Sequence, residues 1–184
     1  MSNLYDDLAF SVSAALRDGT PVTIRVMRPD DRERLVAAFG RLDAASVYTR
    51  FFSFRKELPE KALERIGAID FVHLAGLVAT IGTGVGETVI GTATFVADAS
   101  AEGVRSAEVA FTIEEDYQRQ GLAGRLLSAL ATIARRHGIT RFTADVLADN
   151  RPMLAVFARA SGQLRKRRDG GVLHIEMDLG PEPI

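Results

Sequence analysis

The sequence of 184 residues contains no cysteine, no tryptophan and only three histidines. Without cysteine the chain cannot form disulfides, thiolate zinc sites or iron–sulfur clusters, and it has no thiolate nucleophile. His73, His137 and His174 share no spacing typical of metal ligands, such as four residues along one helix. We therefore expect a protein without a bound metal.

An excess of charge of one sign is also lacking. The chain has 23 lysines and arginines against 24 aspartates and glutamates, so its net charge is −1. This balance gives no reason to expect nucleic acid or an acidic membrane surface as the main partner. The longest uncharged run, residues 71–86, is too short and too rich in glycine to span a bilayer. No lysine or arginine precedes Arg17, whereas secretory signals begin with positive charge, so we expect a cytoplasmic protein.

Hydrophobic residues make up 47% of the chain, which is typical of a globular protein and enough for one buried core. Leu4, Leu8, Val12 and Leu16 recur every four residues and favour a short N-terminal helix, with a frayed end as the alternative. A break at residues 18–21 then separates an N-terminal extension, residues 1–19, from a single domain expected over residues 20–180.

The hydrophobic periodicity predicts the element order β-α-α-α-β-β-β-α-β-α-β-β. Strands are expected at residues 22–27, 74–81, 88–96, 107–113, 142–147, 163–168 and 172–179, and helices at residues 29–41, 44–54, about 59–69, 122–137 and 151–160. The three middle strands have linkers of hairpin composition and should be antiparallel. The strand–helix–strand crossover over residues 107–147 implies one parallel pair, so the fold class is mixed α/β.

Small residues cluster where a predicted strand runs into the longest predicted helix. Gly121, Ala123 and Gly124 fall at the start of this helix, where free backbone N–H groups and the helix dipole attract anions. Their small size would let a pyrophosphate approach those amides, and Arg119 and Arg125 would add positive charge. The same residues would also suit a tight strand-to-helix turn that binds nothing.

The run Asp116-Tyr-Gln-Arg-Gln-Gly-Leu-Ala-Gly-Arg-Leu-Leu127 resembles the acyl-CoA signature Q/R-x-x-G-x-G/A of the GCN5-related N-acetyltransferases (GNAT). Gln118, Gly121 and Ala123 occupy the motif positions. The likeness in organisation covers residues 20–180 and is most specific over residues 107–162. It implies a centrally splayed sheet flanked by helices, acetyl-CoA as the cosubstrate, and direct transfer of an acetyl group to an amine.

The resemblance also assigns residues to the cofactor. In the family, the end of the strand holds the pantetheine arm, the loop amides hold the pyrophosphate, and an asparagine after the next strand contacts the cofactor arm. Many members also carry a tyrosine that protonates the leaving thiolate; Phe157 stands at that position here, which leaves a general acid unassigned. The positions so assigned are Phe111, Thr112, Ile113, Arg119, Gln120, Gly121, Leu122, Ala123, Gly124, Asn150 and Phe157.

Two carboxylates are candidates for the general base. A lysine amine, with a pKa of about 10.4, is almost fully protonated at neutral pH, so its attack needs a base. Glu108 is favoured, because Glu108-Val-Ala-Phe resembles the strand motif that carries the base in histone-type and Pat-type members, and its expected burial would raise its pKa. Asp145, on the next strand, is the alternative. A solvent-facing strand acid remains the non-catalytic interpretation of Glu108.

The N-terminal third, with Arg25-Val-Met-Arg-Pro-Asp-Asp31 and Tyr48-Thr-Arg-Phe-Phe52, looks most like bacterial protein-lysine acetyltransferases of the Pat type. That likeness implies a protein lysine as the acceptor, with acyl-CoA synthetases as clients. A small-molecule amine and a non-catalytic acyl-CoA sensor are the alternatives. The phenylalanines at positions 51, 52 and 54 are interpreted first as core and second as a substrate channel, and residues 114–116 as a solvated acidic turn.

Overall fold

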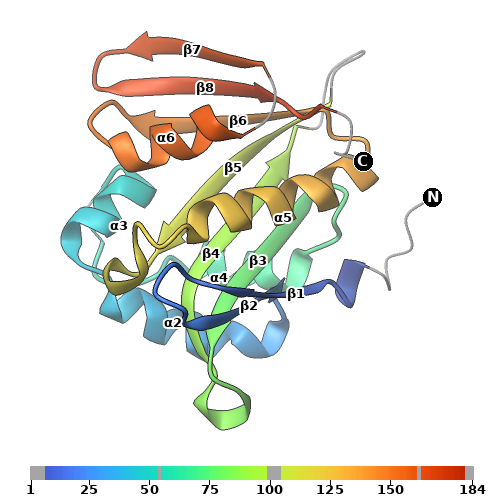
Figure 1. The fold of residues 1–184 in the computed structure, drawn as a ribbon, viewed down its shortest axis with the longest axis vertical. Coiled ribbons are helices and arrows are strands. Elements are labelled where there is room, and N and C mark those ends of the chain that lie inside the picture. The colour runs from blue at the N-terminus through green and yellow to red at the C-terminus, as the bar shows by residue number, and fades with distance from the viewer. Residues whose placement is uncertain (1–6, 54, 99–104, 161–162, 181–184) are drawn as a thin grey trace.

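An eight-stranded sheet with the strand order β1-β2-β3-β4-β5-β6-β8-β7 forms the centre of the protein in a computed structural model (Figure 1). The structure describes residues 7–53, 55–98, 105–160 and 163–180. The β5–β6 pair is parallel and the other neighbouring pairs are antiparallel. The strands are β1 Ser11–Ala15, β2 Pro21–Val26, β3 Leu74–Ile81, β4 Thr88–Ala97, β5 Ser106–Ile113, β6 Arg141–Leu147, β7 Leu164–Asp169 and β8 Val172–Asp178.

Helices cover both faces of the sheet, with α5 on one face and α2 and α4 behind the other (Figure 1). The α-helices are α2 Arg32–Arg41, α3 Ala44–Phe51, α4 Glu60–Glu64, α5 Leu122–Arg136 and α6 Arg151–Arg159. Single 3-10 turns are η1 Pro29–Asp31, η2 Arg65–Ala68, η3 Gly84–Gly86 and η4 Glu115–Tyr117. In the described parts of the chain, no helix combines the length and the apolar character needed to cross a bilayer.

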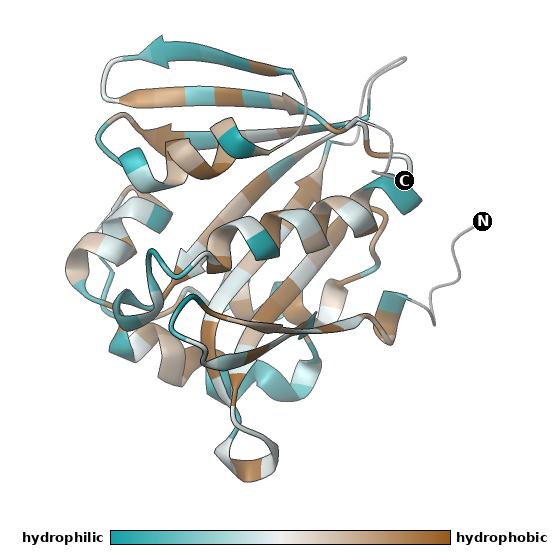
Figure 2. Cartoon of the chain, in the orientation of Figure 1, coloured by the Kyte–Doolittle hydropathy of each residue, from teal (hydrophilic) through white to brown (hydrophobic). Residues whose placement is uncertain are grey.

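The core has two parts, one on each face of the sheet. The larger part packs the apolar side of α5, including Leu126 and Leu130, against strand residues such as Phe95 and Phe142. The smaller part lies under α2 and α4 and consists of Met27, Leu35, Leu63, Ile66, Val78 and Val89. Because side chains alternate along a strand, each central strand serves both parts, and Figure 2 shows much of the brown, hydrophobic colour on these central strands. The outermost strand, β7, is hydrophilic in the same view, as suits an exposed sheet edge.

The sheet opens between β5 and β6. These strands pair only through Ser106–Arg141, Ala107–Phe142 and Glu108–Thr143. Beyond this point β6 stays paired with β8, while residues 109–113 of β5 have no strand partner on the β6 side. The expected central splay and the single parallel pair are therefore confirmed, and backbone groups along this half of β5 remain available to another molecule.

The N-terminal helix predicted for residues 1–19 is wrong where the structure describes that segment. Asp7 and Leu8 are helical, but Val12 lies in β1, where it pairs with Ile24 of β2. The four-residue spacing of apolar residues was misleading, because Ser and Val in residues 11–13 have modest helix propensity and β2 offers an unpaired edge. Leu4 lies outside the described residues.

Candidate active site

The loop between β5 and α5 adopts a backbone conformation that depends on glycine. Gly121 precedes the first residue of α5 and has a φ of 86°, in the left-handed region that side chains with a Cβ rarely adopt. Arg119 also has a positive φ, of 60°. A Cβ on Gly124, in the first turn of α5, would meet no atom within 4 Å. The start of α5 therefore has open space beside Gly124, and residues 121–124 line a cavity.

Side chains from distant parts of the sequence hold this loop from outside. The Gln118 amide nitrogen donates to the carbonyl oxygen of Ile113 at 3.0 Å and to the hydroxyl of Ser46 at 3.2 Å. Arg17, in the β1–β2 turn, donates from its side chain to the carbonyl of Arg119 at 3.1 Å. Gln118 was predictable from the motif, whereas Arg17 was not, because no local pattern signals a contact across 102 residues.

A cavity of about 450 Å³ lies at this loop, between the end of β5, α3 and α6. Nine of the eleven residues assigned to the cofactor line it: Phe111, Thr112, Ile113, Arg119, Gly121, Leu122, Ala123, Gly124 and Asn150. The structure also places Arg17, Ser46, Thr49 and Arg159 on its wall. We call this space the loop cavity. Its charged lining residues are Arg17, Arg119 and Arg159 with Asp43 and Glu115, and the three arginines are suited to binding a phosphate.

Gln120 and Phe157, the other two assigned residues, do not line the loop cavity. The Gln120 side chain donates to Asp18 at 3.4 Å. Phe157 is 1% exposed and packs edge-on against Phe111, with 6.2 Å between the ring centroids. Asn150 uses its side-chain oxygen to cap α6, accepting a hydrogen bond from the backbone N–H of Met153 at 3.2 Å.

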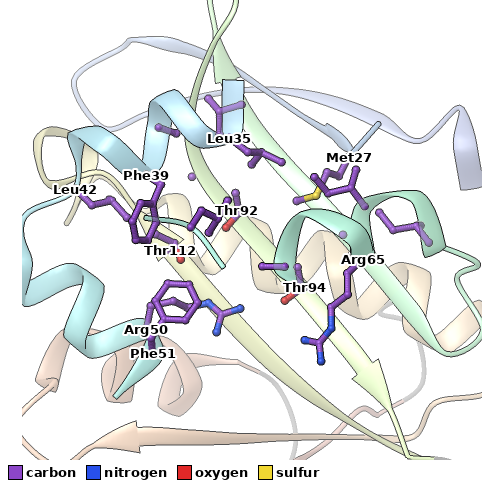
Figure 3. A pocket seen from close by; sticks show the side chains of 18 of the residues that line it. Met27, Leu35, Phe39, Leu42, Arg50, Phe51, Arg65, Thr92, Thr94 and Thr112 are labelled. Atoms are coloured by element: carbon purple, nitrogen blue, oxygen red, sulfur yellow. The ribbon is translucent and has the colours of Figure 1, made fainter. Parts of the chain in front are cut away.

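A second cavity, of about 120 Å³, lies on the opposite face of the sheet, under α2, α3 and α4 (Figure 3). We call it the helix-side cavity. Its wall is mainly apolar, with Leu35, Phe39 and Leu42 among its residues. Its polar members are Arg50, Arg65, Thr92, Thr94, Thr112 and Glu114. Thr112 lines both cavities, so they approach each other at the unpaired half of β5.

Glu108 faces the same side of the sheet as Thr112 but lies beyond the helices that cover it. Glu108 is exposed, so the prediction that its carboxylate is buried is wrong. Its partner on β4, Val96, is itself 38% exposed, so this end of the sheet is open on the face of Glu108 among the described residues. The charge of Glu108 still acts on Arg50 in the helix-side cavity.

Asp145 and His174 line a third cavity, of about 490 Å³, together with Glu108. The Asp145 carboxylate contacts the Nδ1 atom of His174 at 2.5 Å across the β6–β8 pair. In the sequence, His174 stood out only as lacking the spacing typical of metal ligands. The two candidate bases thus lie on one face, and Asp145 already has an imidazole partner.

Glu114 differs from the solvated acid predicted for this turn. One oxygen of its carboxylate accepts a hydrogen bond from Arg41 on α2 at 3.0 Å. The other oxygen is buried and has no hydrogen-bond partner among the described residues. Glu114 continues the strand alternation of β5 and therefore turns toward α2 and the helix-side cavity. Among the described residues, no group of three or more potential metal-ligating side chains is arranged to hold a metal ion.

Comparison with known proteins gives consistent matches. Residues 43–162 match the family model described as the acetyltransferase (GNAT) family. The chain is 34% identical over 171 residues to acetyltransferase Pat of Mycolicibacterium smegmatis, covering 92% of this chain and 49% of that protein. It therefore spans about half the length of that relative. It is also 33% identical to acetyltransferase PA5475 of Pseudomonas aeruginosa, covering 76% of this chain and 73% of that protein.

Solved structures agree on the fold. The GNAT domain of S. lividans PAT superposes with a TM-score of 0.81 at 35% identity, covering 91% of this chain and 96% of that one. The acetyl-CoA complex of yncA from Salmonella typhimurium has the same fold at 19% identity, with a TM-score of 0.69 over 89% of this chain and 96% of that one. The mixed α/β fold implied by the sequence resemblance is confirmed.

Proposed function

This chain belongs to the acetyltransferase (GNAT) family, and we propose that it transfers the acetyl group of acetyl-CoA to the amine of a protein lysine. The observation that carries the proposal is the pair of cavities that approach each other at Thr112. A thioester held along the unpaired half of β5 from the loop cavity would present its carbonyl carbon to an amine arriving from the other face.

Acetyl-CoA fits the loop cavity in charge and in shape. The pyrophosphate lies on the amides of residues 119–124, where the dipole of α5 is positive and Gly124 leaves open space. Arg17 and Arg159 line the same cavity and add positive charge. The pantetheine arm runs along residues 111–113, where β5 has no strand partner on the β6 side and can hydrogen-bond an extended amide-bearing chain.

The proposed reaction is direct attack of a neutral amine on the thioester carbonyl. The amine nitrogen bonds to the carbonyl carbon, the carbon–sulfur bond breaks, and coenzyme A leaves as a thiolate. The proton that the acylated nitrogen then loses is taken up by this thiolate, so the products are the amide and the free thiol of coenzyme A. Backbone N–H groups near Thr112 stabilise the negative charge that develops on the carbonyl oxygen. Glu108, on the acceptor face and exposed, accepts the proton that the ammonium group must lose before attack.

The absence of a hydroxyl at Phe157 is compatible with this chemistry. A thiol has a pKa of about 8.5, by analogy with cysteine, so a thiolate leaves near neutral pH with little help from an acid. Phe157 is buried against Phe111 and supports the strand that borders the loop cavity. The chain therefore needs a base more than it needs an acid.

A lysine acceptor is supported by the likeness of the N-terminal third to Pat-type enzymes and by relatives named Pat at 34% and 35% identity. By the same likeness we propose acyl-CoA synthetases as the client class. The test is incubation with radiolabelled acetyl-CoA and a cell lysate. Label on a few protein bands that disappears with Glu108→Gln supports a lysine acceptor. Label confined to the small-molecule fraction means a small amine, and acetyl-CoA binding without any transfer means a sensor.

A further inference from the structure

Two arginines in the helix-side cavity lack the carboxylate partners that neighbouring arginines have. Arg25, Arg34 and Arg41, on β2 and α2, each pair with a carboxylate. Arg50 and Arg65 form neither an ion pair nor a side-chain hydrogen bond with any residue that the structure describes. Figure 3 shows their guanidinium groups on the same side of the pocket, close to Thr94.

Arg50 is held in this place at an electrostatic cost. It reaches in from α3 with its guanidinium carbon 5.0 Å from the centre of the Phe51 ring. Loss of water around the guanidinium lowers the pKa of Arg50, the charge of Glu108 acts in the opposite direction, and Arg65 adds repulsion. A positive charge that is partly desolvated and repelled by a second one is poorly compensated in the free protein.

The other polar groups of the cavity add hydrogen-bond donors. Thr92, Thr94 and Thr112 line the wall, and none of their hydroxyls has a hydrogen-bond partner among the described residues. Apart from Glu114, which accepts a hydrogen bond from Arg41, the remaining wall is largely apolar. A few convergent donors in an apolar cavity are typical of a site that fixes one polar group of a ligand.

We propose that Arg50 and Arg65 form a subsite for a carboxylate carried by a substrate, next to the reacting amine. The planar guanidinium binds a carboxylate through two parallel hydrogen bonds, and Phe51 keeps the Arg50 plane in place. A volume of about 120 Å³ holds a carboxylate with its adjoining carbons but not a folded peptide segment. The position beside the acceptor face rests on the proposed function; the carboxylate site itself does not.

Two sources could bring this carboxylate. An acidic side chain close to the target lysine would enter with the acceptor, and a dicarboxylic acyl group would enter with the coenzyme A thioester. Both present the same chemistry to Arg50 and Arg65. The experiment therefore needs one arm for the carboxylate alone and one arm for each source.

The first arm is calorimetric titration of the protein with glutarate. We expect saturable binding that weakens about tenfold or more in Arg50→Gln and in Arg65→Gln, with thermal unfolding showing that both variants are folded. Arg55→Gln is the matched control, because Arg55 also lies over the Phe51 ring, at 5.6 Å, but does not line the cavity. Glutarate binding that is absent from the wild type, or equal in wild type and Arg50→Gln, would overturn the proposal.

The second arm measures coenzyme A release with matched substrates. The first pair consists of two lysine peptides, one with glutamate and one with glutamine beside the lysine. The second pair consists of succinyl-CoA and butyryl-CoA. A preference for the acidic member that disappears in Arg50→Gln supports the subsite and identifies its source. No release with any acceptor, while glutarate binding still depends on Arg50, would contradict the proposed function and leave the subsite standing.

Discussion

At the scale of single residues, the alternation along β5 decides which chemistry each side chain can serve. Val109 is buried on the α5 face, whereas Glu108 and Thr112 turn to the face where the acceptor is proposed to enter. The sequence identified Glu108 as a strand carboxylate, but its exposure depends on how far α2–α4 reach over the sheet. How much of the sheet these helices cover is set by tertiary packing, and no local sequence pattern predicts it.

Replacing Glu108 tests the assignment of the base. Glu108→Gln keeps the shape of the side chain but removes its ability to accept a proton. We expect turnover to fall by about 10² or more, within the usual range for a general base, while calorimetric affinity for acetyl-CoA is retained. Asp145→Asn is the companion variant. If Glu108→Gln keeps near-normal turnover and Asp145→Asn loses it, the base is Asp145 together with His174.

Gly121 provides a test of the pyrophosphate site. Gly121→Val places a β-branched residue at a φ of 86° and adds methyl groups at the mouth of the loop cavity. Calorimetric titration should show a loss of acetyl-CoA affinity of about tenfold or more, because the loop amides move away from the phosphate. Gly138→Val is a matched control, since Gly138 has a φ of 72° at the other end of α5. Equal acetyl-CoA affinity in the two folded variants would refute the site.

At the scale of elements, a buried ion cluster fixes the entry to α2. Arg25 of β2 donates two parallel hydrogen bonds to Asp31, at 2.7 and 2.8 Å, and Asp31 also accepts from the backbone N–H of Arg28. Asp31 is 0% exposed and Arg25 is 5% exposed. Because α2 forms the roof of the helix-side cavity, this cluster sets the position of Leu35 over the sheet.

Asp31→Asn should therefore destabilise the protein strongly. Removing one partner leaves the buried Arg25 charge with Glu87 as its remaining carboxylate partner among the described residues, and changes of this type cost about 3–5 kcal/mol. Urea denaturation would measure the loss in free energy of unfolding. Glu60→Gln breaks the exposed Arg32–Glu60 pair on neighbouring helices and should cost no more than about 1 kcal/mol. Similar losses in both variants would contradict the structural importance of the buried cluster.

The same carboxylate predicts how stability depends on pH. Burial alone would raise the pKa of Asp31, but hydrogen bonds from Arg25 and Arg28 hold the pKa below its ordinary value of 3.8. A group whose pKa is lowered by folding stabilises the protein above its unfolded pKa and loses that effect as pH falls through the folded value. The free energy of unfolding should therefore drop below about pH 4, and Asp31→Asn should show a smaller drop.

The elements themselves were largely predictable, and the exception shows why. Strand β3 has the expected bounds, and β7 and β8 pair as expected for neighbouring strands, joined by the two-residue loop Gly170-Gly171. In these segments the hydrophobic period and the turn residues predict the same structure. In β1 the hydrophobic period predicts a helix, but Val12 and Ala14 form a strand through pairing with β2. Such an edge strand depends on its neighbour more than on its own sequence.

At the scale of the whole molecule, the loop cavity and the helix-side cavity differ in how well the sequence predicts the residues that line them. The loop cavity is built largely from one continuous motif that ends a strand and starts a helix, so its residues could be predicted by number. The helix-side cavity combines α2, α3 and α4 with β3–β5, from Met27 to Glu114. No spacing rule connects Arg50 with Thr94, and only the folded sheet brings them together.

Separate cavities for donor and acceptor predict the kinetic order of the reaction. With the donor in the loop cavity and the acceptor at the helix-side cavity, as proposed, both substrates are bound at once, so transfer should proceed through a ternary complex. A chain without cysteine also lacks the thiol that a stable acyl-enzyme most readily uses. Initial rates measured against acetyl-CoA at several acceptor concentrations should therefore give intersecting double-reciprocal lines, with no acetyl group on the protein by mass spectrometry after incubation without acceptor. Parallel lines, together with a stoichiometric protein-bound acetyl group that disappears on adding acceptor, would show that the two cavities do not act together as proposed.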